Sequence, residues 1–195
     1  MNTRMETVAA RGAGTNNRSV HPRKSIAGGN SPLSKLLLWA VLVLYVYLLV
    51  KIILLKFHSL DMGFLWSRLL AGLQQPDLLS QRLESGNLVL FQEISRSLQS
   101  FSSHDRYNLI GNVAIFMPLG ILLGMMFARN KLAGMKVLLC AFLLSLCLET
   151  AQLLFMIGQF DVDDLLLNTI GGMLGFAAYR SAARAIRGTS DKNSI

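Results

Sequence analysis

Residues 109–157, LIGNVAIFMPLGILLGMMFARNKLAGMKVLLCAFLLSLCLETAQLLFMI, contain two long apolar runs separated by a short basic turn. The runs extend from Leu109 to Ala128 and from Leu132 to Ile157. Each provides the ~20 residues that a helix needs to cross a membrane. Arg129 and Lys131 lie between them. These residues predict a tight hairpin of two transmembrane helices as the centre of the fold.

Two further apolar runs flank this hairpin. One extends from Leu36 to Leu55 and is interrupted only by Lys51, whose long side chain can reach the membrane interface. The other extends from Leu165 to about Ala183. With 52% hydrophobic residues and a mean hydropathy of +0.45, the chain is too apolar for an ordinary soluble domain. We predict an all-α integral membrane protein, multi-pass in the cell membrane, with a bundle of about four transmembrane helices.

The distribution of charge predicts the domains and their orientation. Residues 1–33 are rich in Gly, Asn, Ser and Arg and predict a disordered basic arm, residues 34–186 form the transmembrane domain, and residues 187–195 form a short tail. The arm, the hairpin turn and the tail are basic, whereas the link 158–164 is acidic. Because basic segments stay in the cytoplasm, both termini are predicted there. The acidic link and the long connection 58–107 are then predicted outside.

The long connection contains too many charged residues to cross the membrane. Its second half, residues 78–98, has apolar residues at helical spacing: Leu83, Leu90, Ile94 and Leu98. This pattern predicts either an amphipathic helix that lies on the outer membrane surface or a soluble cover that packs on the bundle.

Several function classes are not favoured by the sequence. A formal charge of +8 could indicate a nucleic-acid ligand, but the basic residues gather at the predicted cytoplasmic ends, so the expected partner is the lipid bilayer and no nucleic acid. Cys140 and Cys147 would lie ~10 Å apart along one helix, too far for a disulfide. The sequence has no Cys/His cluster and no phosphate-binding loop, and we predict no metal and no cofactor.

Acidic and amide side chains lie at one depth, near the outer ends of the predicted helices. An isolated charge at the centre of a membrane costs ~2.5 to 3.5 kcal/mol, so such residues usually face the protein interior. Many of these residues are three or four positions apart, which places them on one helix face. The predicted binding site comprises Asn108, Asn112, Glu149, Gln152, Asp161, Asp163, Asp164 and Asn168.

The carboxylates within this set are the candidates for catalysis. One of Asp163 and Asp164 can cap the fourth helix, whereas Glu149 lies about two turns below the membrane boundary and has no capping role. Grouped carboxylates suit a general acid, a proton relay or a cation site. The catalytic residue stays unassigned among Glu149, Asp163 and Asp164, and a purely structural hydrogen bond of Glu149 stays open.

Small residues continue the polar helix faces and predict where the helices pack, because they allow close backbone approach. Pro118 is predicted to kink the second helix and to leave the carbonyl of Ala114 free. The predicted packing residues are Pro118, Gly120, Gly124, Gly171, Gly172 and Gly175.

Three motifs in series resemble those of the VanZ-like family of membrane proteins. They are Asn112-Val-Ala-Ile-Phe116-Met-Pro118-Leu-Gly120, Glu149-Thr-Ala-Gln152, and Phe160-Asp-Val-Asp163-Asp164-Leu-Leu-Leu-Asn168-Thr-Ile-Gly171-Gly172. The segment Asn87 to Phe91 resembles the family's upstream motif, with Leu90 where a proline is usual, and Gln159 replaces a frequent basic residue. The resemblance covers roughly residues 36–179. It implies association with resistance to teicoplanin-type lipoglycopeptide antibiotics.

Three hypotheses about function follow. The first is a protein that recognises a lipid or lipid-linked envelope molecule, or a lipoglycopeptide antibiotic, at the outer leaflet, with Glu149 and Asp164 as central contacts. The second is an intramembrane acid/base enzyme in which Glu149 acts with Asp163 or Asp164 on a lipid-linked substrate. The third is a non-catalytic membrane scaffold. The sequence does not choose among them.

Overall fold

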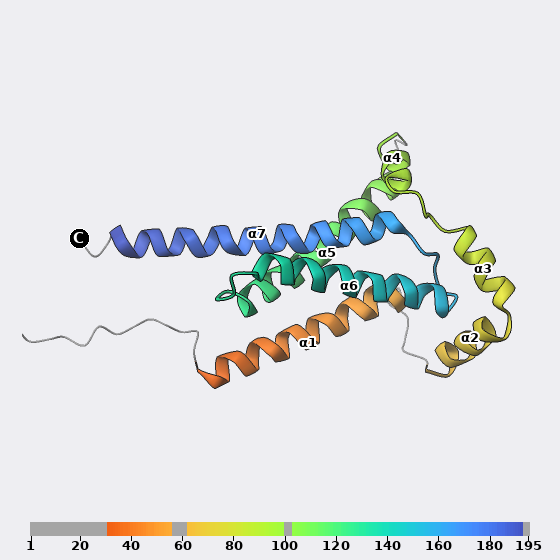
Figure 1. Ribbon diagram of the computed structural model, residues 1–195, viewed down its shortest axis with the longest axis horizontal. Coiled ribbons are helices and arrows are strands. Elements are labelled where there is room, and N and C mark those ends of the chain that lie inside the picture. The colour runs from red at the N-terminus through yellow and green to blue at the C-terminus, as the bar shows by residue number, and fades with distance from the viewer. Residues whose placement is uncertain (1–30, 56–61, 100–102, 193–195) are drawn as a thin grey trace, which may run out of the picture.

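The computed structural model describes residues 31–55, 62–99 and 103–192, and all regular elements within these ranges are α-helices. Figure 1 shows them in chain order. They are α1 (Pro32–Leu55), α2 (Met62–Gln74), α3 (Pro76–Glu84), α4 (Gln92–Gln99), α5 (Ser103–Met126), α6 (Ala133–Leu154) and α7 (Val162–Lys192). The predicted all-α class is confirmed. The predicted disorder of residues 1–30 lies outside the described residues.

Three segments are long and apolar enough to cross a membrane: Pro32–Leu54, Asn108–Met126 and Ala133–Leu154. They contain most of the first three predicted spans, which supports the prediction of a membrane protein. α7 is not among them, although it is the longest helix. Its apolar part lies between Asp164 and Arg180 and is shorter than the ~20 residues of a full span.

Helices α1, α5 and α7 extend beyond the bounds predicted from hydropathy, and α1 begins at Pro32 rather than Leu36. α5 begins at Ser103 rather than Leu109, and α7 continues to Lys192, through most of the predicted tail. Hydropathy identifies only the part of a helix that is apolar enough to lie within a membrane. The second half of α7 is rich in Ala and Arg, which are good helix formers, so the helix continues after the apolar residues end.

In the connection between α1 and α5, residues 78–98 do not form the one amphipathic helix that was an alternative in the prediction. The described part of the connection forms α2, α3 and α4, with an irregular link at residues 85–91. The link passes so close to the start of α7 that a Cβ atom at Gly86 would lie 2.5 Å from the carbonyl oxygen of Phe160. The connection lies across one end of the bundle (Figure 1), as expected for a cover packed on it.

The closest helix contact is between α5 and α7. A Cβ atom at Gly120 would lie 1.9 Å from the carbonyl oxygen of Gly172, and one at Gly175 would lie 1.9 Å from that of Met117. The backbones meet directly, so no larger residue fits at these positions. The other glycines of the predicted set also have close neighbours: Gly171 lies against Val113, Gly172 against Ala141 of α6, and Gly124 against Phe176 and Tyr179.

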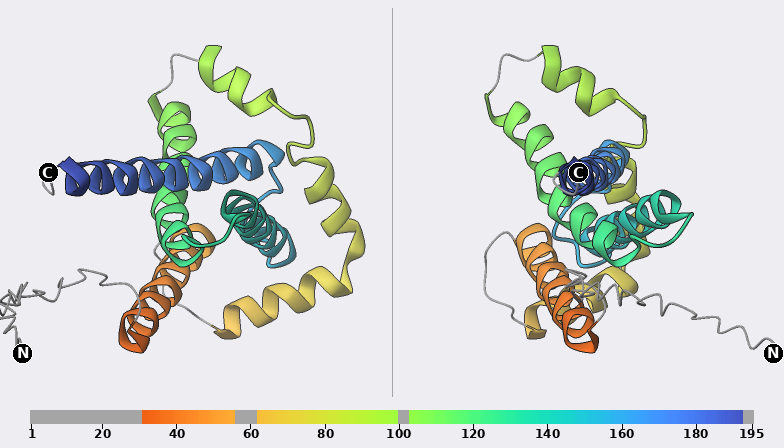
Figure 2. Two further views of the ribbon diagram at one scale, coloured as in Figure 1. Left: turned by 60° about the vertical axis from the view of Figure 1, so that its left-hand side comes forward. Right: turned by 90° about the vertical axis from the view of Figure 1, so that its left-hand side faces the viewer.

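α1 packs on α5 and α6, on the side away from α7, as the views in Figure 2 show. The hydroxyl of Tyr45 donates a 2.6 Å hydrogen bond to the carbonyl oxygen of Ile115. Ile115 follows Ala114, and the carbonyl of Ala114 has no helical donor because Pro118 lacks an amide hydrogen. Leu42 and Leu49 complete a core with Phe116 and Val137. Much of the remaining surface of α1 is exposed and apolar, as expected of a helix that faces lipid.

Candidate polar site at the covered end of the bundle

The connection is joined to the start of α7 by a short backbone pairing. The amide of Asn87 donates to the carbonyl of Phe160, and the amide of Val162 donates to the carbonyl of Asn87, both at 3.0 Å. These bonds form a parallel bridge between Asn87 and Asp161. The bridge holds the link 85–91 beside the acidic segment that begins α7.

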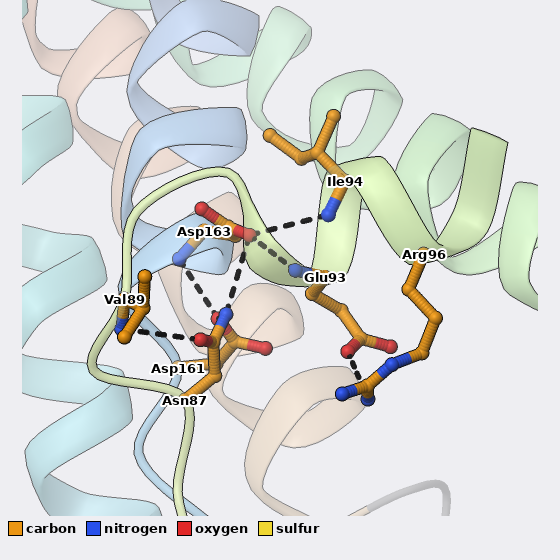
Figure 3. A network of polar contacts seen from close by, with 7 residues as sticks. All are labelled: Asn87, Val89, Glu93, Ile94, Arg96, Asp161 and Asp163. Atoms are coloured by element: carbon orange, nitrogen blue, oxygen red, sulfur yellow. Dashed lines mark hydrogen bonds and ion pairs between the residues drawn. The ribbon is translucent and has the colours of Figure 1, made fainter. Parts of the chain in front are cut away.

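Asp163 binds the N-terminus of α4 from the first turn of another helix. Its side chain is 0% exposed. Its Oδ1 accepts from the amide of Phe91 at 2.6 Å, and its Oδ2 accepts from the amides of Glu93 and Ile94 at 2.8 and 3.2 Å (Figure 3). Free amides and the positive end of the helix dipole favour a carboxylate at this position. Asp163 thus caps a helix that lies 70 residues away in the sequence.

Asn87 and Asp161 complete this network. The Asn87 amide nitrogen Nδ2 donates to Asp161 Oδ1 at 2.9 Å and to Asp163 Oδ2 at 3.2 Å, as drawn in Figure 3. Asp161 Oδ1 also accepts from the backbone amide of Asp163 at 2.8 Å. Asp163 therefore accepts four hydrogen bonds and has little capacity left for a ligand.

Glu149 lies on α6, below the acidic segment, and is 2% exposed. Its Oε2 accepts a 3.1 Å hydrogen bond from the backbone amide of Asp161. Oε1 has no hydrogen bond to the residues that the structure describes. A buried carboxylate with one weakly satisfied oxygen is costly unless a proton or a ligand completes its environment.

Asp164 faces the same region from α7. Its Oδ1 accepts a hydrogen bond from Nδ2 of Asn112 on α5. Asp164 precedes the predicted fourth span, which begins at Leu165. Burial and the nearby charge of Asp161 raise the pKa of Asp164 to about 7, and the hydrogen bond from Asn112 opposes this rise.

Asn168 and Ser145 form a second polar layer one turn further from the connection. Asn168 is 3% exposed and donates from Nδ2 to Ser145 Oγ at 2.9 Å. Its Oδ1 is buried and has no hydrogen-bond partner among the described atoms. Leaving such an acceptor unpaired costs roughly 1–3 kcal/mol. Ser145 is one helical turn from Glu149, and Asn168 is one turn from Asp164, so the two layers lie on the same helix faces.

The remaining two predicted site residues lie elsewhere. Gln152 donates from Nε2 to the carbonyl of Ile53 at 3.1 Å and so holds α1 against α6. Asn108 is exposed and makes no described hydrogen bond to the carboxylates. Asn87 and Ser145 belong to the site but are not in the set predicted from the sequence. Ser145 could have been found from its i−4 position relative to Glu149, whereas the contact of Asn87 depends on distant chain segments.

The site contains acceptors and lacks a compensating positive charge within the described ranges. The ion pair that the structure describes joins Arg96 and Glu93 at 2.8 Å. It lies on the surface of α4 and does not neutralise the site (Figure 3). No group of three or more His, Cys, Asp or Glu residues in these ranges is arranged to hold a metal ion. The free oxygens of Glu149, Asp164 and Asn168 can accept hydrogen bonds from a ligand, or carboxylates can exchange a proton with it.

A family model described as VanZ/LLP1 matches residues 42–184, which include every residue of the predicted site. The chain belongs to the VanZ/LLP1 family. It is similar to Protein VanZ of Enterococcus faecium, with 33% identity over 90 residues, or 46% of this chain and 55% of that protein. The match thus spans about half the length of this curated relative. No solved structure matches the chain. Membership of the VanZ/LLP1 family confirms the predicted resemblance.

Proposed function

We propose that this VanZ-like protein recognises a lipid or lipid-linked envelope component at the outer leaflet, and that this recognition contributes to resistance against teicoplanin-type lipoglycopeptides. The observation that carries the proposal is the group of oxygen acceptors on buried Glu149, half-buried Asp164 and buried Asn168, which lacks a described cationic partner. Polar groups are retained at membrane depth chiefly where they serve a function or pair with one another. Here the pairing is incomplete.

The chemistry of these acceptors selects the part of the ligand that enters the site. Carboxylate and amide oxygens bind hydroxyl or ammonium groups, whereas they repel a phosphate. Sugar hydroxyls and amino groups of a lipid-linked glycan or peptide have the required donors. Because Glu149 is 2% exposed, the ligand reaches it when the connection moves away from the end of the bundle.

The proposal includes four membrane spans with both termini in the cytoplasm. α7 supplies the fourth span from Leu165, and its short apolar part is compensated by its arginines, which can reach the interface. The basic turn between α5 and α6 then lies inside, and the acidic segment 158–164 lies outside. A reporter fused after Gly158 should be extracytoplasmic. A cytoplasmic reporter would contradict the proposed orientation.

The test of function is the susceptibility of a sensitive Gram-positive host to teicoplanin and vancomycin. Wild-type protein, Glu149→Gln and Glu84→Gln are expressed at matched levels. Glu84 is an exposed residue of α3, so its substitution makes the same chemical change outside the site. We expect selective teicoplanin resistance from wild type and Glu84→Gln, and its partial loss in Glu149→Gln. Full resistance in Glu149→Gln would overturn the proposed role of the site.

An intramembrane acid/base enzyme is the second candidate. It is supported by the electrostatic influence of Asp164 on Glu149, which lies on an adjacent helix. The capping role of Asp163 leaves these two residues as the pair available for proton transfer. An enzyme should lose nearly all function in Glu149→Gln, a binding protein should lose part of it, and a scaffold should lose little.

A further inference from the structure

A second site lies at the other end of the bundle, between the turn that joins α5 to α6 and the second half of α7. A cavity of about 370 Å³ opens there. Its size is within the roughly 300–1,000 Å³ range of small-ligand sites. Figure 1 shows that α7 continues past this turn toward its C-terminus, so the helix forms one wall of the cavity and the turn forms the other.

The rim of this cavity is strongly basic. Five cationic side chains line it: Arg129, Lys131, Arg180, Arg184 and Arg187. The three arginines of α7 are spaced four and three residues apart, which places them on one helix face. The other two cations come from the turn, so positive charge approaches the cavity from both walls.

Among the side chains that the structure describes, no carboxylate forms an ion pair with these cations. The ion pair between Arg96 and Glu93 belongs to α4, at the opposite end of the bundle. Arg180 lies over the ring of Phe176, 5.7 Å from its centroid, and this contact fixes the guanidinium without neutralising it. Like charges gathered around one cavity repel one another unless an anion enters.

Part of the cavity lining is apolar. Phe176 and Ala133 are buried, and Ala183 and Tyr179 are half-buried beside them. A guanidinium binds a phosphate group through two parallel hydrogen bonds, which makes arginine the preferred residue for this group. A lining that contains both cationic and apolar side chains fits an anionic head that carries an apolar part.

We propose that this cavity binds a phosphate group, supplied either by the head of an anionic phospholipid or by a soluble phosphate. The phospholipid is the source favoured by the apolar side chains in the lining and by the place of the cavity, beyond the apolar part of α7 and on the side that the charge distribution assigns to the cytoplasm. The site is separate from the carboxylate site, and its test does not depend on resistance.

The test uses the full chain purified in a neutral detergent, with thermal unfolding followed during titration. Phosphatidylglycerol, phosphatidylcholine, inorganic phosphate and chloride of equal ionic strength are compared. We expect phosphatidylglycerol to raise the unfolding temperature and phosphatidylcholine and chloride not to do so. A similar rise with inorganic phosphate would support the same site and identify a soluble phosphate as its ligand.

Substitutions then locate the binding. The pair Arg180→Gln and Arg184→Gln should weaken it by about tenfold or more, because two charge-assisted contacts are lost. The pair Arg129→Gln and Lys131→Gln, on the opposite wall, should have a similar effect, which guards against a folding defect in either variant. The pair Lys35→Gln and Arg68→Gln removes the same charge from exposed positions outside the cavity and should leave binding unchanged. Undiminished binding in both cavity variants, or no anion-specific shift in wild type, would overturn the proposal.

Discussion

At the scale of single residues, the acidic positions of the site have different surroundings and therefore different roles. Asp163 is saturated by backbone amides of α4 and by Asn87. Glu149 and Asp164 each accept one described hydrogen bond. The sequence placed these carboxylates near one another from their depth in the predicted helices. It could not distinguish the capping carboxylate from the others, because the amides that Asp163 binds belong to a distant segment.

Asp163→Asn is predicted to destabilise the protein. The new amide group would place donors against the backbone amides of Glu93 and Ile94, so a buried donor loses its acceptor, at a cost of roughly 1–3 kcal/mol. The control, Glu93→Gln, keeps the backbone amides that Asp163 binds and removes the ion pair with Arg96, which contributes roughly 0–1 kcal/mol. Thermal unfolding in detergent compares the two. Equal unfolding temperatures would contradict the capping role.

Asp164→Asn is predicted to stabilise the protein more at pH 8 than at pH 5. The folded-state pKa of Asp164 is raised to about 7, above its ordinary value near 4, so the folded state binds the proton more tightly. Its favourable contribution is complete below pH ~4 and is lost as the pH rises through about 7. Asparagine carries no charge and avoids this loss. The measurement is the unfolding temperature of both proteins across this pH range. A gain in unfolding temperature that does not depend on pH would contradict the prediction.

At the scale of helices, local sequence and distant contacts determine different features. The hairpin of α5 and α6 could be predicted because each apolar run is long enough to cross a membrane, and Arg129 and Lys131 separate the two runs. The division of the connection into short helices could not, because α4 is capped by Asp163 and the link at Gly86 is held against Phe160. Both contacts depend on how the chain folds back.

Gly120→Ala is predicted to separate α5 from α7, because its Cβ would lie 1.9 Å from the carbonyl oxygen of Gly172. Overpacking of this kind typically costs about 1–3 kcal/mol. Gly111→Ala, in the same helix, meets nothing within 4 Å and should be neutral or slightly stabilising, since alanine favours the helix. The two variants are compared by thermal unfolding and by yield of folded protein. The interpretation fails if Gly120→Ala is as stable as Gly111→Ala.

At the scale of the whole molecule, the two ends of the bundle have opposite chemistry. The end beneath the connection holds buried carboxylate and amide oxygens, and the other end holds a cavity lined with arginine and lysine. This polarity could be predicted from the acidic and basic links between the apolar runs. The cavity itself could not, because it depends on the continuation of α7 past the hairpin turn.

The most direct test of the central claim is native mass spectrometry of the protein extracted from membranes of the susceptible host. Wild type and the Glu84→Gln control should retain a lipid-linked envelope molecule that carries hydroxyl or amino groups. Glu149→Gln should lose most of it while keeping its fold, because glutamine replaces one carboxylate oxygen with an NH₂ group that cannot accept hydrogen bonds from those donors. Equal retention of this molecule by wild type and Glu149→Gln would contradict the claim that the buried carboxylate site recognises it.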